Sequence, residues 1–231
     1  MNKIGDFMNL KKQILAIALI AFTCINATEL TYTPANTEIF WDIHHVIIKK
    51  KGSEILKTLY NAPKIALLSN LFNWTLLKDM FALRGSTGGA YMQRLKQEDQ
   101  RLADFALNMA NSQVMINGME DLILDLANQG YTMHVASNIG SEVYEHLKNK
   151  FPHIFNENVI KDGKTVDFKS ENPVEKPHAQ FFIELSSLRN KNKQHALFID
   201  DKQENVDAAN ANGFIGILFK NAQQLKQELK K

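Results

Sequence analysis

The sequence predicts an α/β fold in which a parallel sheet has helices on both faces. Apolar runs rich in β-branched and aromatic residues alternate with amphipathic segments of helical length, and strands that alternate with helices in this way pair in parallel. The composition supports the same class, because 45% hydrophobic and 23% charged residues are ordinary for a globular chain. At 231 residues the chain has room for one core and a small insertion.

Residues 1–27 have the layout of a secretory signal peptide. Two lysines precede the uncharged apolar run 14–25, and the small residue Ala27 follows it. The run is shorter than the ~20 residues that a membrane-spanning helix needs. We therefore expect export to the periplasm or the medium, with no stable membrane span once the leader is cleaved. An uncleaved anchor is the alternative, and a start at Met8 would give a more regular leader.

The rest of the chain, residues 28–231, is neutral and lacks cysteine. Of the 27 Lys and Arg and 25 Asp and Glu residues, three lysines and one aspartate lie in the leader, which leaves 24 of each sign. A neutral body offers no electrostatic surface for nucleic acid. Cys24, the single cysteine, also lies in the leader, so thiol catalysis and disulfides are excluded from the body. No feature of the sequence indicates the oligomeric state.

The predicted elements begin with a buried strand at 38–48 (EIFWDIHHVII), which runs into a loop near Asp42. Met119 begins an amphipathic helix, whose apolar residues recur with helical spacing until Gly130 can end it. A strand at 131–136 follows. The next helix has its apolar positions at Val143, Leu147 and Phe151.

The second half of the chain continues this alternation. Pro177 suits the first turn of a helix. Strand 196–199, helix 204–212 and strand 214–219 follow, with Gly213 able to close the middle helix. The apolar faces of the helices hold Phe181, Phe182, Leu185 and Leu188 in the first, and Leu225 and Leu229 in a helix-prone tail.

Polar residues follow the predicted strands at the points where each strand ends. The carboxyl ends of parallel strands meet at one edge of a sheet, where such folds bind their ligands. The residues expected at this edge are Asp42, His44 and His45 after the first strand, Ser137 and Asn138 after the second, Lys176 before a helix, and Asp200, Asp201 and Asn205 after the strand at 196–199.

This set of side chains favours magnesium and phosphoryl chemistry. Clustered carboxylates need a cation, and ligation by oxygen alone suits Mg²⁺. A lysine and a hydroxyl opposite them match a phosphoryl group, for which positioning and charge neutralisation supply most of the catalysis. A carboxylate is a suitable nucleophile. Asp200 and Asp201, two adjacent acids at the end of an apolar strand, are the strongest single indication of a cation.

Four short motifs follow one another along the chain: an aspartate after the first strand, Ser-Asn after a later one, Lys-Pro before a helix and Asp-Asp after another strand. Together they resemble the four motifs of the haloacid dehalogenase (HAD) superfamily. The resemblance covers residues 38–219 and is closest in the stretches GMEDLILDLANQGYTMHVASN and LFIDDKQENVDAANANGF. It points to the capped, phosphatase-type branch. That resemblance implies a Rossmann-like core, with a small helical cap inserted after the first strand at about residues 50–116.

The resemblance also implies roles for the residues that bind phosphate. Asp42 matches the nucleophile, which forms an aspartyl-phosphate and binds Mg²⁺ through its other oxygen. Ser137 matches the hydroxyl that binds a phosphoryl oxygen, with Asn138 beside it shaping the loop. Lys176 matches the lysine that offsets the charge of the nucleophile and the phosphate.

The metal ligands are implied in the same way. Asp201 matches a direct ligand, while Asp200 and Asn205 match residues that hold metal-bound water. The residue two positions after the nucleophile, here His44, ligates the metal through its backbone carbonyl in this family. Because the ligand is a backbone carbonyl, it is present whatever side chain the residue carries.

The side chain of His44 departs from the family pattern. Most phosphatases of the family have an aspartate here, which protonates the leaving oxygen and then activates water, and a glycine next, where this chain has His45. A histidine can shuttle a proton near neutral pH, although Mg²⁺ disfavours its cationic form. We therefore leave three readings of His44 open, a proton shuttle, a substrate contact or a relic. His45 is expected to be structural or to line the rim.

The expected function is that of a Mg²⁺-dependent phosphatase acting on a small phosphomonoester. A catalytically silent HAD-fold binding protein is the alternative, because of His44, and haloacid dehalogenation is a third reading that the paired acids disfavour. Two alternatives concern which residues supply the Ser-Asn motif and the lysine. The segment 64–70 (KIALLSN) could supply the Ser-Asn motif in a protein without a cap, and Lys169 could replace Lys176. Ser137 and Asn138 could also form a plain helix N-cap.

Overall fold

A computed structural model of the chain describes residues 31–53, 112–167, 170 and 172–230. The chain divides into two units, and every helix and strand below lies in the unit Tyr32–Leu229. The expected leader, the KIALLSN segment, Lys169 and most of the expected cap lie outside the described residues. Within the described part, none of the helices combines the length and apolar character that crossing a bilayer requires.

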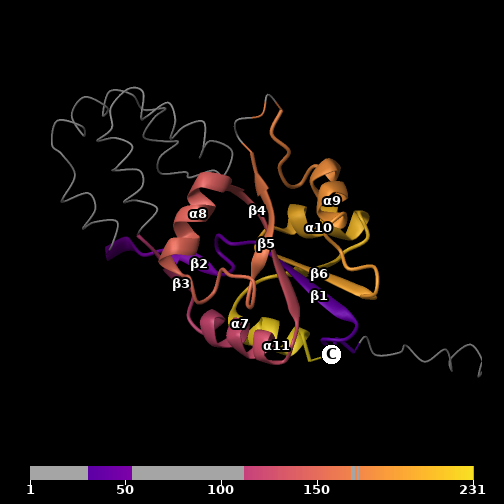
Figure 1. The fold of residues 1–231 in the computed structure, drawn as a ribbon, viewed down its shortest axis with the longest axis horizontal. Coiled ribbons are helices and arrows are strands. Elements are labelled where there is room, and N and C mark those ends of the chain that lie inside the picture. Colours follow the sequence, from indigo (N-terminus) through magenta and orange to yellow (C-terminus); the bar gives the residue numbers. More distant parts are fainter. Residues whose placement is uncertain (1–30, 54–111, 168–169, 171, 231) are drawn as a thin grey trace, which may run out of the picture. The chain divides into compact units, whose positions relative to one another are not determined.

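A five-stranded parallel sheet in the order β5-β4-β1-β6-β7 forms the centre of this unit (Figure 1). Its strands are β1 (Thr37–Trp41), β4 (Thr132–Gly140), β5 (Lys161–Val166), β6 (His195–Asp200) and β7 (Ile215–Leu218). From β1 the chain passes to β4 on one side and later to β6 on the other. The carboxyl end of β1 is thus the point where strand order reverses, which is where parallel sheets bind ligands.

Helices cover both faces of the sheet, as the sequence predicts (Figure 1). Successive side chains of β1 alternate between the faces: Ile39 and Trp41 belong to one apolar cluster, and Phe40 belongs to the other. The first face is covered by α7 (Met119–Asn128), α8 (Ser141–Lys150) and α11 (Ala222–Glu228), and the second by α9 (Ala179–Ser186) and α10 (Gln203–Ala211).

Three phenylalanines fix the second face. Phe182 of α9 lies edge-to-face against Phe198 of β6 at 5.3 Å and Phe214 at 6.0 Å between ring centroids. Such pairs contribute about 0.5–1.5 kcal/mol each beyond the area they bury. Because Lys176 lies just before α9 and Asp200 ends β6, this packing sets the distance between the two charged residues.

The predicted strand at 38–48 is two strands. β1 ends at Trp41, and the amides of Ile47 and Ile48 both donate to the carbonyl of Ile43, which closes a tight turn. Beyond the turn, β2 (Ile48–Lys50) pairs antiparallel with β3 (Gln113–Met115). The two ends of the interval expected to hold the cap are therefore joined by a short two-stranded sheet.

Three further elements differ from the sequence-based expectation. The edge strand β5 has the polar sequence KDGKTV, which lacks an apolar pattern, and a Cβ at its Gly163 would lie 2.0 Å from the Val135 carbonyl oxygen. β4 continues to Gly140, beyond the expected end at 136. Pro177 lies outside the first turn of its helix, because α9 begins at Ala179.

Candidate active site

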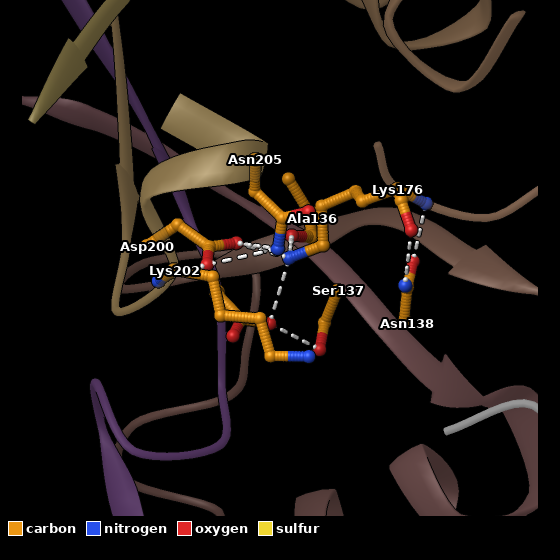
Figure 2. A network of polar contacts seen from close by, with 8 residues as sticks. Ala136, Ser137, Asn138, Lys176, Asp200, Lys202 and Asn205 are labelled. Atoms are coloured by element: carbon orange, nitrogen blue, oxygen red, sulfur yellow. Dashed lines mark hydrogen bonds and ion pairs between the residues drawn. The ribbon is translucent and has the colours of Figure 1, made fainter. Parts of the chain in front are cut away.

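Side chains from four separate segments meet at the carboxyl end of β1 (Figure 2). Asp42 follows β1, Ser137 lies in β4, Lys176 precedes α9 and Asp200 ends β6. All four side chains are buried. The structure therefore brings together the residues that the sequence places after its strands.

One carboxylate oxygen of Asp42 has two donors. The Ser137 hydroxyl donates to Asp42 Oδ1 at 2.6 Å, and Lys176 Nζ lies 2.9 Å from the same oxygen. Burial acts to raise the pKa of Asp42, but the Lys176 ammonium and the Ser137 hydrogen bond outweigh it and hold the pKa below its ordinary value. Asp42 is therefore ionised at neutral pH, as a nucleophile or a metal ligand must be.

The ammonium of Lys176 links two buried carboxylates. Besides Asp42 it contacts Asp200 Oδ2 at 2.6 Å, and it donates to the backbone carbonyl of Ala136 at 3.0 Å (Figure 2). Burial alone would lower the pKa of Lys176, but the two carboxylates outweigh it and raise the pKa. Lys176 is therefore a fixed positive charge between the two aspartates.

Both carboxylate oxygens of Asp200 are engaged within the protein. Asn205 Nδ2 donates to Oδ1 at 2.9 Å and to Oδ2 at 3.0 Å, and the Lys202 amide donates to Oδ1 at 2.9 Å. Burial and the charge of Asp42 raise the pKa of Asp200 despite the nearby ammonium of Lys176. This carboxylate anchors Lys176 and the start of α10, which suits an indirect role toward a metal.

Three aspartates form a group that fits a divalent cation. Asp42, Asp200 and Asp201 each offer a carboxylate oxygen, and these oxygens lie within 4.8 Å of one another. Lys176 pairs with the first two, whereas Asp201 has no ion pair in the described ranges. Burial and repulsion from Asp42 raise the pKa of Asp201. Three carboxylates against one ammonium leave an excess of negative charge that a cation bound by oxygen ligands would offset.

Asn138 holds the lysine loop. Its side-chain amide donates to the Lys176 carbonyl at 3.0 Å and accepts from the Lys176 amide at 2.8 Å (Figure 2). The loop-shaping role expected for Asn138 thus has a geometric basis. The helix N-cap reading is wrong, because Ser137 and Asn138 lie inside β4 and Gly140 caps α8.

His44 lies two residues after Asp42, and one of its imidazole nitrogens is buried. Its Nε2 is inaccessible and has no hydrogen-bond partner. Burial lowers the pKa of His44 to about 4; the charge of Asp42 opposes this effect, while Lys50 and His45 add to it. The ring is therefore neutral near pH 7.

His45 is exposed and occupies the left-handed backbone region, with φ of 62°. This region favours glycine, which is the usual residue of the family at this position. The interaction of His45 with the nearby Asp201 partly opposes the rise in the pKa of that carboxyl, which burial and Asp42 cause. The placement agrees with the rim position expected from the sequence.

Sequence reasoning missed one polar residue of the site. Gln113 is fully buried in β3, and an interaction of its side chain with His44 opposes the fall in the pKa of that imidazole. The sequence carries no signal for this contact. It depends on an antiparallel pairing between two three-residue strands on either side of a long insertion.

Comparison with known protein families identifies the family of this chain. A family model described as haloacid dehalogenase-like hydrolase matches residues 48–217, most of the chain. The chain belongs to this family. The matched range of the HAD-like hydrolase model starts after Asp42, so the match itself does not include that residue. No curated protein matches the chain.

Solved structures of HAD proteins share the fold. HAD family enzyme bt-2542 from Bacteroides thetaiotaomicron is 18% identical, with a TM-score of 0.55 over 87% of this chain and 100% of that one. The HAD-hydrolase YfnB from Bacillus subtilis, bound to magnesium, is 15% identical, with a TM-score of 0.54 over 86% and 100%. L-2-haloacid dehalogenase from Xanthobacter autotrophicus, with chloropropionic acid covalently bound, is 15% identical, with a TM-score of 0.51 over 84% and 82%.

Proposed function

We propose that this HAD-like hydrolase is an exported, Mg²⁺-dependent phosphatase that acts on a small phosphomonoester through an aspartyl-phosphate on Asp42. The observation that supports it most directly is the pair of donors on Asp42 Oδ1, the Ser137 hydroxyl and the Lys176 ammonium. A carboxylate nucleophile beside two donors for phosphoryl oxygens is what phosphoryl transfer needs. In support, bt-2542 has been crystallised with magnesium and inorganic phosphate. Export is proposed from the leader sequence.

The metal would be held by Asp42, Asp201 and the backbone carbonyl of His44, with Asp200 acting through water. When bound, Mg²⁺ would neutralise part of the charge on the phosphoryl group and its nucleophile. The grouping of the three carboxylate oxygens supports this assignment.

The protein's own residues would perform two displacements. A carboxylate oxygen of Asp42 attacks phosphorus while the bond from phosphorus to the alcohol oxygen breaks, and that oxygen takes up a proton to leave as the alcohol. Water then attacks phosphorus, giving up one proton, and inorganic phosphate and free Asp42 carboxylate result. Ser137 and Lys176 hold the phosphoryl oxygens throughout.

We assign the transfer of these protons to His44, the residue two positions after Asp42. Because its pKa of about 4 keeps the ring neutral, it is better suited to accept the proton of the attacking water than to protonate a leaving alcohol. We expect aryl phosphates, whose leaving oxygen needs little protonation, to react faster than alkyl phosphates.

A phosphatase assay on the chain from Thr28 onward tests the proposal. With Mg²⁺ the protein should release phosphate from p-nitrophenyl phosphate, and Asp42→Asn should abolish release. Asp207→Asn, which changes an exposed acid of α10, is the matched control and should keep full activity. Background-level release across a broad panel of phosphomonoesters would reject the proposal.

A silent binding protein is the second candidate, and the neutral ring of His44 favours it. The double substitution His44→Asp with His45→Gly separates the two. If activity appears only in the double variant, the natural protein binds without turnover. Haloacid dehalogenation is tested in the same preparation by chloride release from 2-chloropropionate without Mg²⁺. The acid pair Asp200 and Asp201 argues against it.

A further inference from the structure

Lys202 places a second lysine side chain beside the active site. It follows Asp201 directly and is exposed. Within the described residues its ammonium makes no hydrogen bond and no ion pair. The other lysine of the site, Lys176, is buried and pairs with Asp42 and Asp200. Lys202 therefore carries a positive charge that is free to meet a ligand.

The main chain holds Lys202 at the edge of the site. Its amide donates to Asp200 Oδ1 at 2.9 Å. Its carbonyl accepts from the amide of Asn205 at 3.1 Å and from that of Val206 at 3.2 Å. These bonds fix the backbone at the junction of β6 and α10, while the long side chain keeps the freedom of its flexible stem.

The side chain of Lys202 runs into the site. Figure 2 shows it extending from the start of α10 toward Ser137, whose hydroxyl lies 2.6 Å from Asp42 Oδ1. Ser137 is the residue that the proposed mechanism assigns to a phosphoryl oxygen. The ammonium of Lys202 is therefore directed toward the side of the site that the phosphoryl group would occupy.

The charge of Lys202 acts on two nearby acids and pairs with neither. Burial raises the pKa of Asp201 and of Glu175, and in both the charge of Lys202 opposes the rise. No ion pair joins Lys202 to either carboxylate in the described ranges. The ammonium is thus close enough to be attracted by the acids of the site, but it is not held by them.

The charge balance of the site gives such a lysine a function. When ionised, the three aspartates, together with Lys176 and a bound Mg²⁺, carry no net charge. A phosphomonoester brings a charge of about −1.5 to −2 at pH 7. That charge stays uncompensated unless another cation approaches, and an ammonium offers three donors for phosphoryl oxygens.

We propose that Lys202 is a second lysine that binds the phosphoryl group, with its ammonium contacting the phosphoryl oxygens from the α10 side of the site. This inference rests on the proposed phosphatase function. The phosphoryl group is negatively charged in the substrate and in the transition state, so Lys202 would bind both alike. A contact of this kind lowers KM and leaves kcat unchanged.

Lys202→Met tests this contact, because it keeps the length of the side chain and removes its charge. It should raise the KM for p-nitrophenyl phosphate by about 10-fold, with kcat close to that of the natural protein. Lys202→Arg keeps the charge and should restore most of the affinity. Lys191→Met is the control, because Lys191 is an exposed lysine before β6, at the opposite end of the sheet. An unchanged KM in Lys202→Met would overturn the inference.

Metal binding distinguishes a contact with the phosphoryl group from damage to the site. Removing a positive charge beside Asp201 does not weaken the attraction of the site for a cation. Calorimetry without phosphate should therefore show that Lys202→Met binds Mg²⁺ at least as tightly as the natural protein. A joint loss of affinity for Mg²⁺ and for phosphate would overturn the inference, since it would show that Lys202 only maintains the shape of the site.

Binding of inorganic phosphate keeps this inference separate from the proposed function. If the natural protein hydrolyses no phosphomonoester, the proposed function fails, and calorimetry with inorganic phosphate and Mg²⁺ then decides the inference. Binding that weakens by about 10-fold in Lys202→Met and persists in Lys202→Arg and Lys191→Met supports it. Equal binding by the natural protein and Lys202→Met, or no detectable binding, overturns it.

Discussion

The hydroxyl of Ser137 donates a 2.6 Å hydrogen bond to Asp42 Oδ1, although 95 residues separate the two in sequence. The contact follows from the sheet, because β1 and β4 pair in parallel with Trp41 opposite Val135. Each residue lies just beyond this pair on its own chain segment. Strand pairing therefore sets the position of Asp42 against Ser137.

Ser137→Ala tests the role of this hydroxyl. The substitution removes the hydroxyl proposed to donate to the phosphoryl group, and loss of such a donor lowers kcat by about 10²–10³-fold. Steady-state kinetics on p-nitrophenyl phosphate with Mg²⁺ measures the effect. Ser187→Ala, at an exposed serine after α9, is the control. Activity that equals the natural protein's would remove Ser137 from the catalytic site.

Lys176→Met should destabilise the protein as well as inactivate it. The ammonium compensates Asp42 and Asp200, both buried, and removing one partner of a buried ion pair costs about 3–5 kcal/mol. Urea denaturation of the metal-free protein gives the change in the free energy of unfolding. Lys202→Met, at an exposed lysine, should change it little. A second substitution, Asp200→Asn, should recover part of the loss, since it removes the uncompensated charge.

Mg²⁺ should stabilise the folded protein through Asp201. A ligand present at 100 times its Kd adds about 2.7 kcal/mol to the free energy of unfolding. Because Asp201 has no ion pair in the described part of the chain, its carboxylate gains most from a cation. Thermal unfolding with and without MgCl₂ should show a rise in Tm that Asp201→Asn reduces and Asp207→Asn retains. An equal rise in all three proteins would contradict this metal assignment.

The strands of the sheet could be predicted wherever the sequence carries an apolar run of strand length. β1, the first part of β4, β6 and β7 come from apolar stretches of the sequence, and α7 shows helical spacing of its apolar residues, so these elements are encoded locally. β5 could not be predicted in this way. Its residues are polar because it is an edge strand, and it pairs through its backbone with β4.

The residues of the site likewise divide into those that the sequence pattern reveals and those that it does not. Asp42, Ser137, Lys176 and Asp200 adjoin the ends of apolar strands or a helix, and the topology of a parallel sheet gathers such positions. Gln113 could not be found from the sequence. Its neighbour His44 is reached only through the β2–β3 pairing, and three-residue strands leave no periodic signal.

His44 should make stability depend on pH. Its ordinary pKa of 6.5 applies to the unfolded chain, and burial lowers the value to about 4 in the folded protein. Between these values the unfolded chain binds a proton that the folded chain does not, so the free energy of unfolding falls as the pH falls. The loss reaches roughly 3 kcal/mol at the lower end of the window.

Urea denaturation of the metal-free protein between pH 7 and pH 4 measures this dependence. Other carboxyl groups titrate near the lower end, so the informative quantity is the difference between the natural protein and His44→Gln. That difference should change with pH across the window. A constant difference would show that the ring takes up its proton equally well in the folded and unfolded chain.

Gln113→Met should stabilise the folded protein. A buried polar group without a partner loses its hydrogen bonds to water, at a cost of about 1–3 kcal/mol, and an apolar side chain of similar length avoids that cost. The Gln113 side chain is fully buried, and its amide oxygen and nitrogen have no hydrogen-bond partner within the geometric limits for such a bond. Urea denaturation without ligand should show a higher free energy of unfolding for Gln113→Met and no change for Gln129→Met, at an exposed residue that caps α7. A lower value for Gln113→Met would mean that the amide is paired in the folded protein, for example with the imidazole of His44.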